Sequence, residues 1–263
     1  MKTIAKIVRF ELANVARNRW VIGYALFFFV VSDVLLRLGG SAPRALLSLM
    51  NVVLLLIPLV TIVFGTIYWH SSREFTELLL TQPVQRNSLY HGLFAGLVLP
   101  LSAAFAAGVT VPLTLHRAIT SETVVPLALM LVAGVALTAI FGAMAVLIGG
   151  LVEDRLRGLG VALGVWLLLT IVYDGIVLAV TVAFADYPLE GPMLALTFLN
   201  PIDLARVLLV LRFDVSALMG YTGAIFARTL GGGTGTLLAL TGLLFWMLVP
   251  GLFALRAFKR KDF

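Results

Sequence analysis

Polar side chains inside long apolar stretches are the first candidates for chemistry in this chain. Asp174 lies beside Tyr173 in the middle of such a stretch, where a carboxylate within a membrane costs about 2.5–3.5 kcal/mol. It must therefore face protein or a water-filled path, so the two residues are the best candidates for a transport pathway. A structural hydrogen bond between helices explains Asp174 equally well. Asn51 and Asp33 are weaker candidates, because Asn51 can bridge two helices and Asp33 is near enough to a stretch end to reach the headgroups.

Motifs for bond-breaking chemistry are missing from the sequence. The closest match to a phosphate-binding loop, Gly231–Thr236, lacks the lysine that such a loop requires. His70, His91 and His116 are scattered and have no partner at metal-ligand spacing. Neither the His-Glu-x-x-His motif nor the Gly-x-Ser-x-Gly motif occurs. We therefore expect no enzyme activity, no metal site and no cofactor bound by this chain.

The composition is that of a membrane protein. Of the 263 residues, 61% are hydrophobic and 12% are charged, and the mean hydropathy is +1.07, whereas a soluble domain is roughly 25% charged. Several apolar stretches exceed the roughly 18 residues that mark a transmembrane helix. There is no cysteine, which excludes disulfides and thiolate metal ligands.

These stretches predict an all-α integral membrane protein with six transmembrane helices in a single domain, residues 1–263. The expected spans are Trp20–Leu36, Leu46–Trp69, Leu89–Leu115, Val124–Leu151, Leu159–Phe184 and Thr234–Leu255. An interfacial helix should precede them, with a short cytoplasmic helix after the second span and an outer helical segment before the last.

The distribution of charge predicts the orientation. If the N-terminus is inside, most of the 19 Lys and Arg residues fall on the cytoplasmic side, as the positive-inside rule requires. Three of the others, Arg206, Arg212 and Arg228, fall in the long outer segment 185–233. Both termini are then cytoplasmic. The net charge of +6 is explained by the basic residues that flank the spans on the cytoplasmic side. No nucleic-acid partner is therefore expected.

Residues 1–19 have the pattern of a helix lying on the membrane surface. Apolar residues recur at helical spacing, with basic residues available to the other side, which suits binding to anionic lipid headgroups. An ordinary basic flank of the first span is the alternative. The apolar positions are Ile4, Ile7, Val8, Leu12 and Val15.

The inner loop 70–88 and the outer segment 185–233 both carry helix signals. Ser71 and Glu74 have the spacing of a capping box, and Pro83 marks where the helix should stop. A loop folded back on the bilayer is the alternative. In the outer segment, Asn200 reads as an N-cap followed by Pro201 in the first turn. We expect a helical cap near the outer surface there, with a re-entrant segment as the alternative.

Small residues mark two helix surfaces that permit close approach in lipid. Gly160 and Gly164 form a Gly-x-x-x-Gly pair, and Gly134, Thr138 and Gly142 form a stripe on the fourth span. Packing within one chain and pairing of two chains explain these surfaces equally well.

The layout, together with two motifs, resembles the permease subunits of type-2 ABC transporters. The segment Glu74–Arg86 is similar to the stretch in those permeases that runs from an acidic turn through a leucine run to Thr-x-Pro-x-x-Arg. The segment Leu199–Arg206 is similar to the outer Asn-Pro-x-Asp-x-x-Arg stretch of the NosY-like branch. That branch serves maturation of the copper-sulfur centre of nitrous oxide reductase.

The resemblance implies a location in the inner membrane of a bacterium or archaeon. It also implies partners for the chain. The segment Arg73–Gln82 would be a coupling helix that docks on a cytoplasmic ATPase, which would bind the ATP and Mg²⁺. Two copies of the chain would pair, and a periplasmic accessory protein would join them. An exporter of a lipid, drug or peptide, and a membrane anchor or scaffold that moves nothing, remain as alternatives. The implied ATPase contacts are Arg73, Glu74, Phe75, Thr76, Glu77, Leu78, Thr81, Gln82 and Arg86, with Glu153, Asp154 and Arg155 as a second, smaller contact.

Overall fold

The computed structural model describes residues 19–81, 85–185, 187, 190–211 and 233–260. The predicted interfacial helix therefore lies outside the described residues except for Arg19, and so do Gln82, Pro83 and part of the outer segment. Every element in the described part of the chain is helical. The all-α prediction is confirmed.

Six helices are long and apolar enough to cross a membrane, which confirms the predicted number of spans among the described residues. One of them, Arg155–Ala183, consists of two α-helices joined by a turn of π-helix. The elements are α2 (Arg19–Leu38), α3 (Ala42–Ser71), α4 (Arg73–Leu80), α5 (Arg86–Leu115), α6 (Val124–Leu151), α7 (Arg155–Leu167), η1 (Leu168–Val172), α8 (Tyr173–Ala183), α9 (Glu190–Phe198), α10 (Pro201–Val210) and α12 (Gly233–Arg260).

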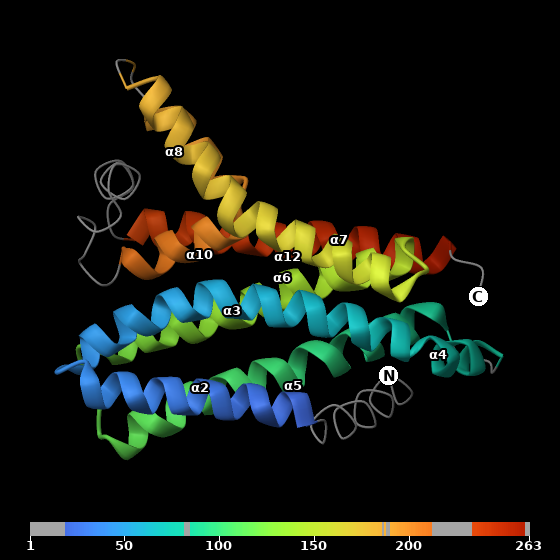
Figure 1. Ribbon diagram of the computed structural model, residues 1–263, viewed down its shortest axis with the longest axis horizontal. Helices are drawn as coiled ribbons and strands as arrows, with labels where there is room; N and C mark the ends of the chain where they lie inside the picture. Colours follow the sequence, from blue (N-terminus) through green and yellow to red (C-terminus); the bar gives the residue numbers. More distant parts are fainter. Residues whose placement is uncertain (1–18, 82–84, 186, 188–189, 212–232, 261–263) are drawn as a thin grey trace.

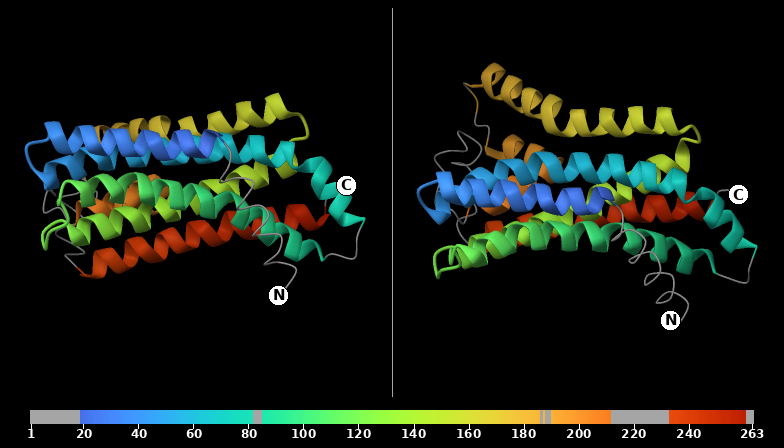
Figure 2. Two further views of the ribbon diagram at one scale, coloured as in Figure 1. Left: turned by 90° about the horizontal axis from the view of Figure 1, so that it is seen from below. Right: turned by 60° about the horizontal axis from the view of Figure 1, so that its bottom comes forward.

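Helices α3 and α6 form the centre of the bundle, with α2 packed on α5 and α12 packed on α6. Small residues permit the close contacts: a Cβ added at Gly134 of α6 would lie 2.2 Å from Cε1 of Phe105 on α5. The Phe105 ring meets Phe28 of α2 edge to face, with ring centroids 5.1 Å apart. Figures 1 and 2 place α4, the start of α7 and the end of α12 together. We call this side of the molecule the α4 end.

The span formed by α7, η1 and α8 is the least buried of the six. Only 11% of its most apolar 18-residue stretch is buried, whereas 56% of the corresponding stretch is buried in α5 and in α6. Helix α8 has no buried residue. Figure 1 shows α8 diverging from the other helices. A broad apolar face of this span is therefore uncovered in the single chain.

Helices α9 and α10 are bent by 113° relative to each other. At their junction, the amide of Asn200 donates to the carbonyl of Leu169, at the middle of the fifth span, over 2.8 Å. The indole of Trp246, at the middle of α12, donates to the carbonyl of Phe198 over 2.9 Å. These two contacts place the junction beside the middle of two spans, which favours the re-entrant alternative over a cap near the outer surface, and we call α9 and α10 the re-entrant pair. Buried backbone at such depth is possible because neighbouring spans satisfy it.

The expected short helix after the second span is present as α4, but its predicted capping box is wrong. Helix α3 continues through Ser71, so this residue cannot begin the next helix, and Ser72 at the junction makes no side-chain cap. The backbone N–H of Ser72 donates to Tyr68 and its carbonyl accepts from Thr76, each over 2.9 Å. Helical hydrogen bonding thus passes across the junction and ties α4 to α3.

Candidate functional site

Helix α4 presents one face to solvent and the other to the molecule. Glu74 and Leu78, four residues apart on one helical face, are exposed, and Leu78 retains 66% of its accessible surface. Thr76 is buried and donates its hydroxyl to the carbonyl of Ser72 over 2.8 Å. Glu74 forms no ion pair with another described residue, and an exposed leucine beside an exposed carboxylate gives this short helix a surface suited to protein contact.

The other predicted α4 residues support the helix or flank it. Arg73 and Glu77 pair with each other over 3.0 Å, one turn apart, and Thr81 donates to the carbonyl of Leu78 at the helix end. Phe75 is partly buried. Arg86, at the start of α5, donates to the carbonyl of Lys259 over 2.9 Å and so holds α5 to the end of α12.

The second predicted contact lies at the same end of the bundle. Glu153, Asp154 and Arg155 are all exposed in the connection between α6 and α7. The carboxylate of Asp154 accepts from the N–H of Arg157 over 2.8 Å and caps α7. The imidazole of His70, in the last turn of α3, reaches this connection over 3.0 Å at the carbonyl of Val152. The structure therefore brings both predicted contacts to one surface.

A shallow groove runs beside the second contact, between the ends of α6 and α12. Its volume is about 680 Å³, and Glu153 and Arg256 contribute its charged groups while Leu151 and Phe253 contribute apolar wall. Both charged side chains are exposed. The groove widens the surface at the α4 end on which a partner can bind.

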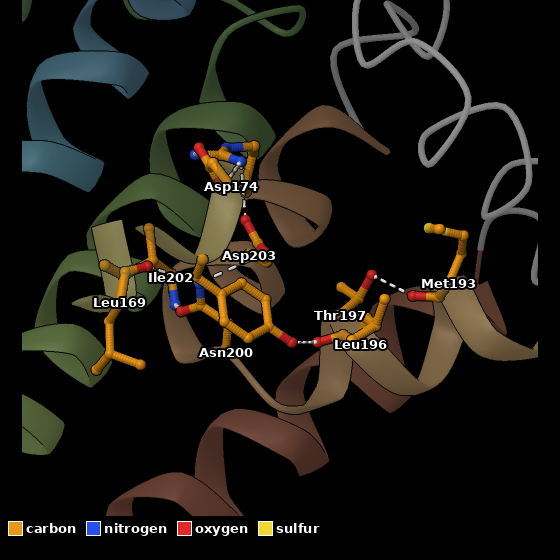
Figure 3. Close-up of polar contacts among 10 residues, drawn as sticks. Leu169, Asp174, Met193, Leu196, Thr197, Asn200, Ile202 and Asp203 are labelled. Atoms are coloured by element: carbon orange, nitrogen blue, oxygen red, sulfur yellow. Dashed lines mark hydrogen bonds and ion pairs between the residues drawn. The ribbon is translucent and has the colours of Figure 1, made fainter. Parts of the chain in front are cut away.

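In the fifth span, Asp174 has a partner that was not predicted from the sequence (Figure 3). Arg206 of α10 approaches it with two nitrogens, over 3.3 and 3.2 Å, and reaches Asp203 over 2.8 Å. One guanidinium thus links the fifth span to the re-entrant pair. The positive-inside rule assigned Arg206 to the outer side of the membrane, so its pairing with Asp174 was not predicted. Two features of the sequence indicate this pairing: Arg206 follows Asp203 by three residues, and Asp174 in a membrane span needs a counter-charge.

Two further groups extend this network. Asn200 donates to Asp203 over 3.4 Å, and its side-chain oxygen accepts from the N–H of Ile202 over 3.0 Å, which confirms the predicted N-cap. The hydroxyl of Tyr173 donates to the carbonyl of Leu196 on α9. We call Tyr173, Asp174, Asn200, Asp203 and Arg206 the polar network. It carries two carboxylates against one guanidinium and is accessible at Asp174, whose side chain is 44% exposed.

The remaining pathway candidates lie away from the network. Asp33 pairs with Arg37 over 2.8 Å and faces the imidazole of His116 over 2.7 Å, near the end opposite α4. Asn51 is exposed on α3 and makes no hydrogen bond to another described residue. Within the described residues, no three His, Cys, Asp or Glu side chains are grouped as metal ligands are.

The two small-residue surfaces have different surroundings. The stripe of Gly134, Thr138 and Gly142 packs against other helices of the same chain, because a Cβ added at Gly142 would lie 3.2 Å from Val98 of α5. The hydroxyl of Thr138 donates to the carbonyl of Gly134 within α6. Gly160 and Gly164 are exposed, with open space where a Cβ would be. They lie on the uncovered fifth span.

Comparison with known proteins agrees with this arrangement. The family model described as ABC-2 family transporter protein matches residues 50–263. The chain is 27% identical to a probable ABC transporter permease protein NosY of Stutzerimonas stutzeri, over 99% of both chains. It is also 27% identical to the protein of the same name from Pseudomonas aeruginosa, over 84% of this chain and 86% of that one. The chain therefore belongs to the ABC-2 transporter family, as a membrane permease subunit that has no ATPase activity of its own and works with a separate cytoplasmic ATPase.

Proposed function

We propose that this permease is a NosY-like subunit that serves maturation of the copper-sulfur centre of nitrous oxide reductase. The observation that carries the proposal is similarity to two NosY permeases along most or all of each chain. The chain itself binds no cofactor, and ATP and Mg²⁺ belong to the partner. The membrane is the inner membrane of a bacterium or archaeon.

The α4 end is the cytoplasmic side in this proposal, and both chain termini are there. Helix α4 is the coupling helix, which binds the ATPase through the face that carries Glu74 and Leu78. The exposed residues Glu153–Arg155 form the second contact. A helix joined to α3 by continuous hydrogen bonds transmits a displacement of the ATPase directly into the second span.

Two copies of the permease pair through the fifth span. This span buries the least surface within the chain, and Gly160 and Gly164 are exposed on it. In lipid, small residues on an uncovered helix favour close packing with another helix. The pair would then bind two ATPase subunits, and a periplasmic accessory protein would bind the opposite side.

The polar network is the candidate pathway in this arrangement. Asp174 is partly exposed on the same fifth span that we assign to the pairing surface. Its carboxylate therefore lies where a path between two copies would run. Charged groups within membrane spans cost free energy, so a network that contains three of them is expected to have a function, and we assign it to the transport path.

A gene-replacement experiment tests the maturation role. This chain, with its own ATPase, is expressed in a Stutzerimonas stutzeri strain that lacks NosY, and nitrous oxide reduction by the cells is measured. Restored reduction supports the proposal. A complex that assembles and hydrolyses ATP without restoring reduction points to export of a lipid, drug or peptide. No stimulation of ATP turnover by the permease favours a scaffold that moves nothing.

A substitution experiment tests the coupling helix. The double variant Glu74→Lys with Leu78→Ser changes the exposed face and leaves the Arg73–Glu77 pair intact. We expect it to insert in the membrane but to lose most of its binding to the ATPase in co-purification. The matched control is Glu122→Lys, an exposed acidic residue at the opposite end. Parental co-purification and ATP turnover by the double variant would exclude α4 as the coupling helix.

A further inference from the structure

The groove between the ends of α6 and α12 has walls that belong to two membrane spans. Leu147 and Leu151 line it from α6, and Phe253 and Ala257 line it from α12. Residues four apart lie on one face of a helix, so each span turns one side towards the groove. Leu151 retains 69% of its accessible surface and Phe253 retains 53%. The walls therefore present apolar surface that nothing covers in the single chain.

Packing on the opposite face of α12 holds the groove in place. Ala254 and Phe258 are each 1% exposed, and the ring of Phe258 meets that of Trp69 on α3 edge to face, with ring centroids 5.6 Å apart. Tyr90 of α5 donates its hydroxyl to the carbonyl of Gly251 over 3.0 Å. One side of α12 is thus fixed against α3 and α5, and the side that lines the groove is formed before any ligand binds.

Small residues keep the floor of the groove open. A Cβ added at Gly150 of α6 would lie 3.8 Å from the Cβ of Ala257, which is ordinary van der Waals contact. Within the described part of the chain, no other atom beyond its own helix and its neighbours comes within 4 Å of that position. A larger side chain at Gly150 would therefore occupy the groove.

The groove carries one charge of each sign. Glu153 follows the last residue of α6 by two positions, and Arg256 follows Phe253 on α12 by three, so that both line the groove. Both side chains are exposed. No ion pair joins either of them to another residue that the structure describes. A carboxylate and a guanidinium are thus both available to a ligand in the groove.

Other basic residues at this end do not line the groove. Arg86 of α5 and Lys259 of α12 are exposed nearby, and the guanidinium of Arg86 bonds to the carbonyl of Lys259. Together with Arg256 they attract any phospholipid phosphate. They do not distinguish one headgroup from another. Glu153 does, because its carboxylate repels a purely anionic headgroup and attracts one that also carries an ammonium group.

We propose that this groove binds a molecule of phosphatidylethanolamine, with its phosphate at Arg256, its ammonium group at Glu153 and an acyl chain along Leu151 and Phe253. The phosphate accepts from the guanidinium and the ammonium donates to the carboxylate, so both hydrogen bonds are charge-assisted. The apolar walls replace lipid or water along the chain. The site goes beyond the proposed function and depends on the proposed orientation only for its place in the cytoplasmic leaflet.

Lipid titration of the full-length permease tests this site. The protein is purified in detergent without the ATPase, because Glu153 also belongs to the proposed ATPase contact. It is then delipidated and titrated with dioleoyl phosphatidylethanolamine or dioleoyl phosphatidylglycerol, and bound lipid is measured by native mass spectrometry. Phosphatidylglycerol carries the phosphate but no ammonium group. We expect the parent to bind phosphatidylethanolamine about five to ten times more tightly.

Two charge variants separate the roles of the headgroup contacts. Glu153→Gln should weaken binding of phosphatidylethanolamine by about five to ten times and should not weaken binding of phosphatidylglycerol. Arg256→Gln should weaken binding of both lipids by a similar factor. Glu122→Gln and Arg117→Gln, the same changes at exposed positions of the opposite end, are the matched controls and should retain parental affinities.

A third variant tests the apolar part. Gly150→Leu fills the groove while both charges remain, so binding of both lipids should fall. Equal affinity of the parent for the two lipids, or parental binding of phosphatidylethanolamine by Glu153→Gln, would overturn the headgroup assignment. If Gly150→Leu retains the lipid but no longer captures the ATPase, the groove is part of the ATPase contact and the lipid site is refuted. Since the titration contains no ATPase, failure of the proposed coupling role would leave its outcomes unchanged.

Discussion

Replacing Arg206 by glutamine should destabilise the protein more than any other single change in the polar network. Among the residues that the structure describes, Arg206 is the cation that lies between the two carboxylates of the network, and it bonds to both. Its removal leaves Asp203 and Asp174 without a counter-charge in the network. Replacing Asp174 by asparagine instead leaves Arg206 paired with Asp203.

The expected loss of stability for each substitution depends on how exposed the two carboxylates are. The side chain of Asp203 is 12% exposed and that of Asp174 is 44% exposed. Removing one partner of a buried ion pair costs about 3–5 kcal/mol, whereas exposed pairs contribute about 0–1 kcal/mol. We therefore expect Arg206→Gln to cost about 2–4 kcal/mol, mostly at Asp203, and Asp174→Asn to cost about 1 kcal/mol or less.

Thermal unfolding of the permease–ATPase complex in lipid nanodiscs measures this difference. For a chain of this size, 1 kcal/mol corresponds to a change in Tm of about 2–4 °C. Arg206→Gln should then lower Tm by about 4–16 °C and Asp174→Asn by at most about 4 °C. Arg117→Gln, the same change at an exposed position, is the control. Equal losses for Asp174→Asn and Arg206→Gln, or no loss beyond the control for Arg206→Gln, would refute this account of the network.

Three further predictions concern orientation, packing within the chain and pairing of two chains. Single cysteines at Glu122 and Glu153, just outside the two ends of α6, should react with an impermeant reagent from opposite sides of the membrane, with Glu122 outside; labelling of both from one side contradicts the topology. Gly134→Ala should destabilise the chain by about 1–3 kcal/mol in the same unfolding assay, because its Cβ would overlap Phe105. Gly160→Leu should leave the single chain stable but reduce pairing in cross-linking experiments, and unchanged pairing would remove the fifth span from the proposed interface.

The spans were predictable because their signal is local. Twenty or more apolar residues in succession identify a transmembrane helix without reference to its neighbours. The re-entrant pair was harder, since Asp203 and Arg206 make its second helix read as too polar for the membrane. Arg206 pairs with both Asp203 and Asp174, and the second of these pairs exists only after the fifth span and α10 are brought together.

The capping box failed for a related reason. Ser71 and Glu74 have the correct spacing, but the pattern does not reveal whether the preceding helix has already ended. Helix α3 extends to Ser71, so the residue that should have capped α4 belongs to the last turn of α3. The residues of α4 that could contact a partner were predicted by type, whereas the pairing of Arg73 with Glu77, which neutralises two of those charges against each other, followed only from the helix geometry.

The same geometry connects the α4 end with the polar network. Helix α3 runs without interruption from Ala42 to Ser71, and the indole of Trp166 on α7 donates to the carbonyl of Leu55, near its middle, over 3.3 Å. Trp166 directly precedes the last residue of α7, and the π-helical turn that follows sets the direction in which Tyr173 and Asp174 point. A displacement of α3 by the ATPase would therefore reach the fifth span at that turn. If the outer half of the span moves, the contacts of α8 with the re-entrant pair must yield. They are the polar contacts of Tyr173 and Asp174 and the packing of Val177, Val180 and Thr181 on Met193.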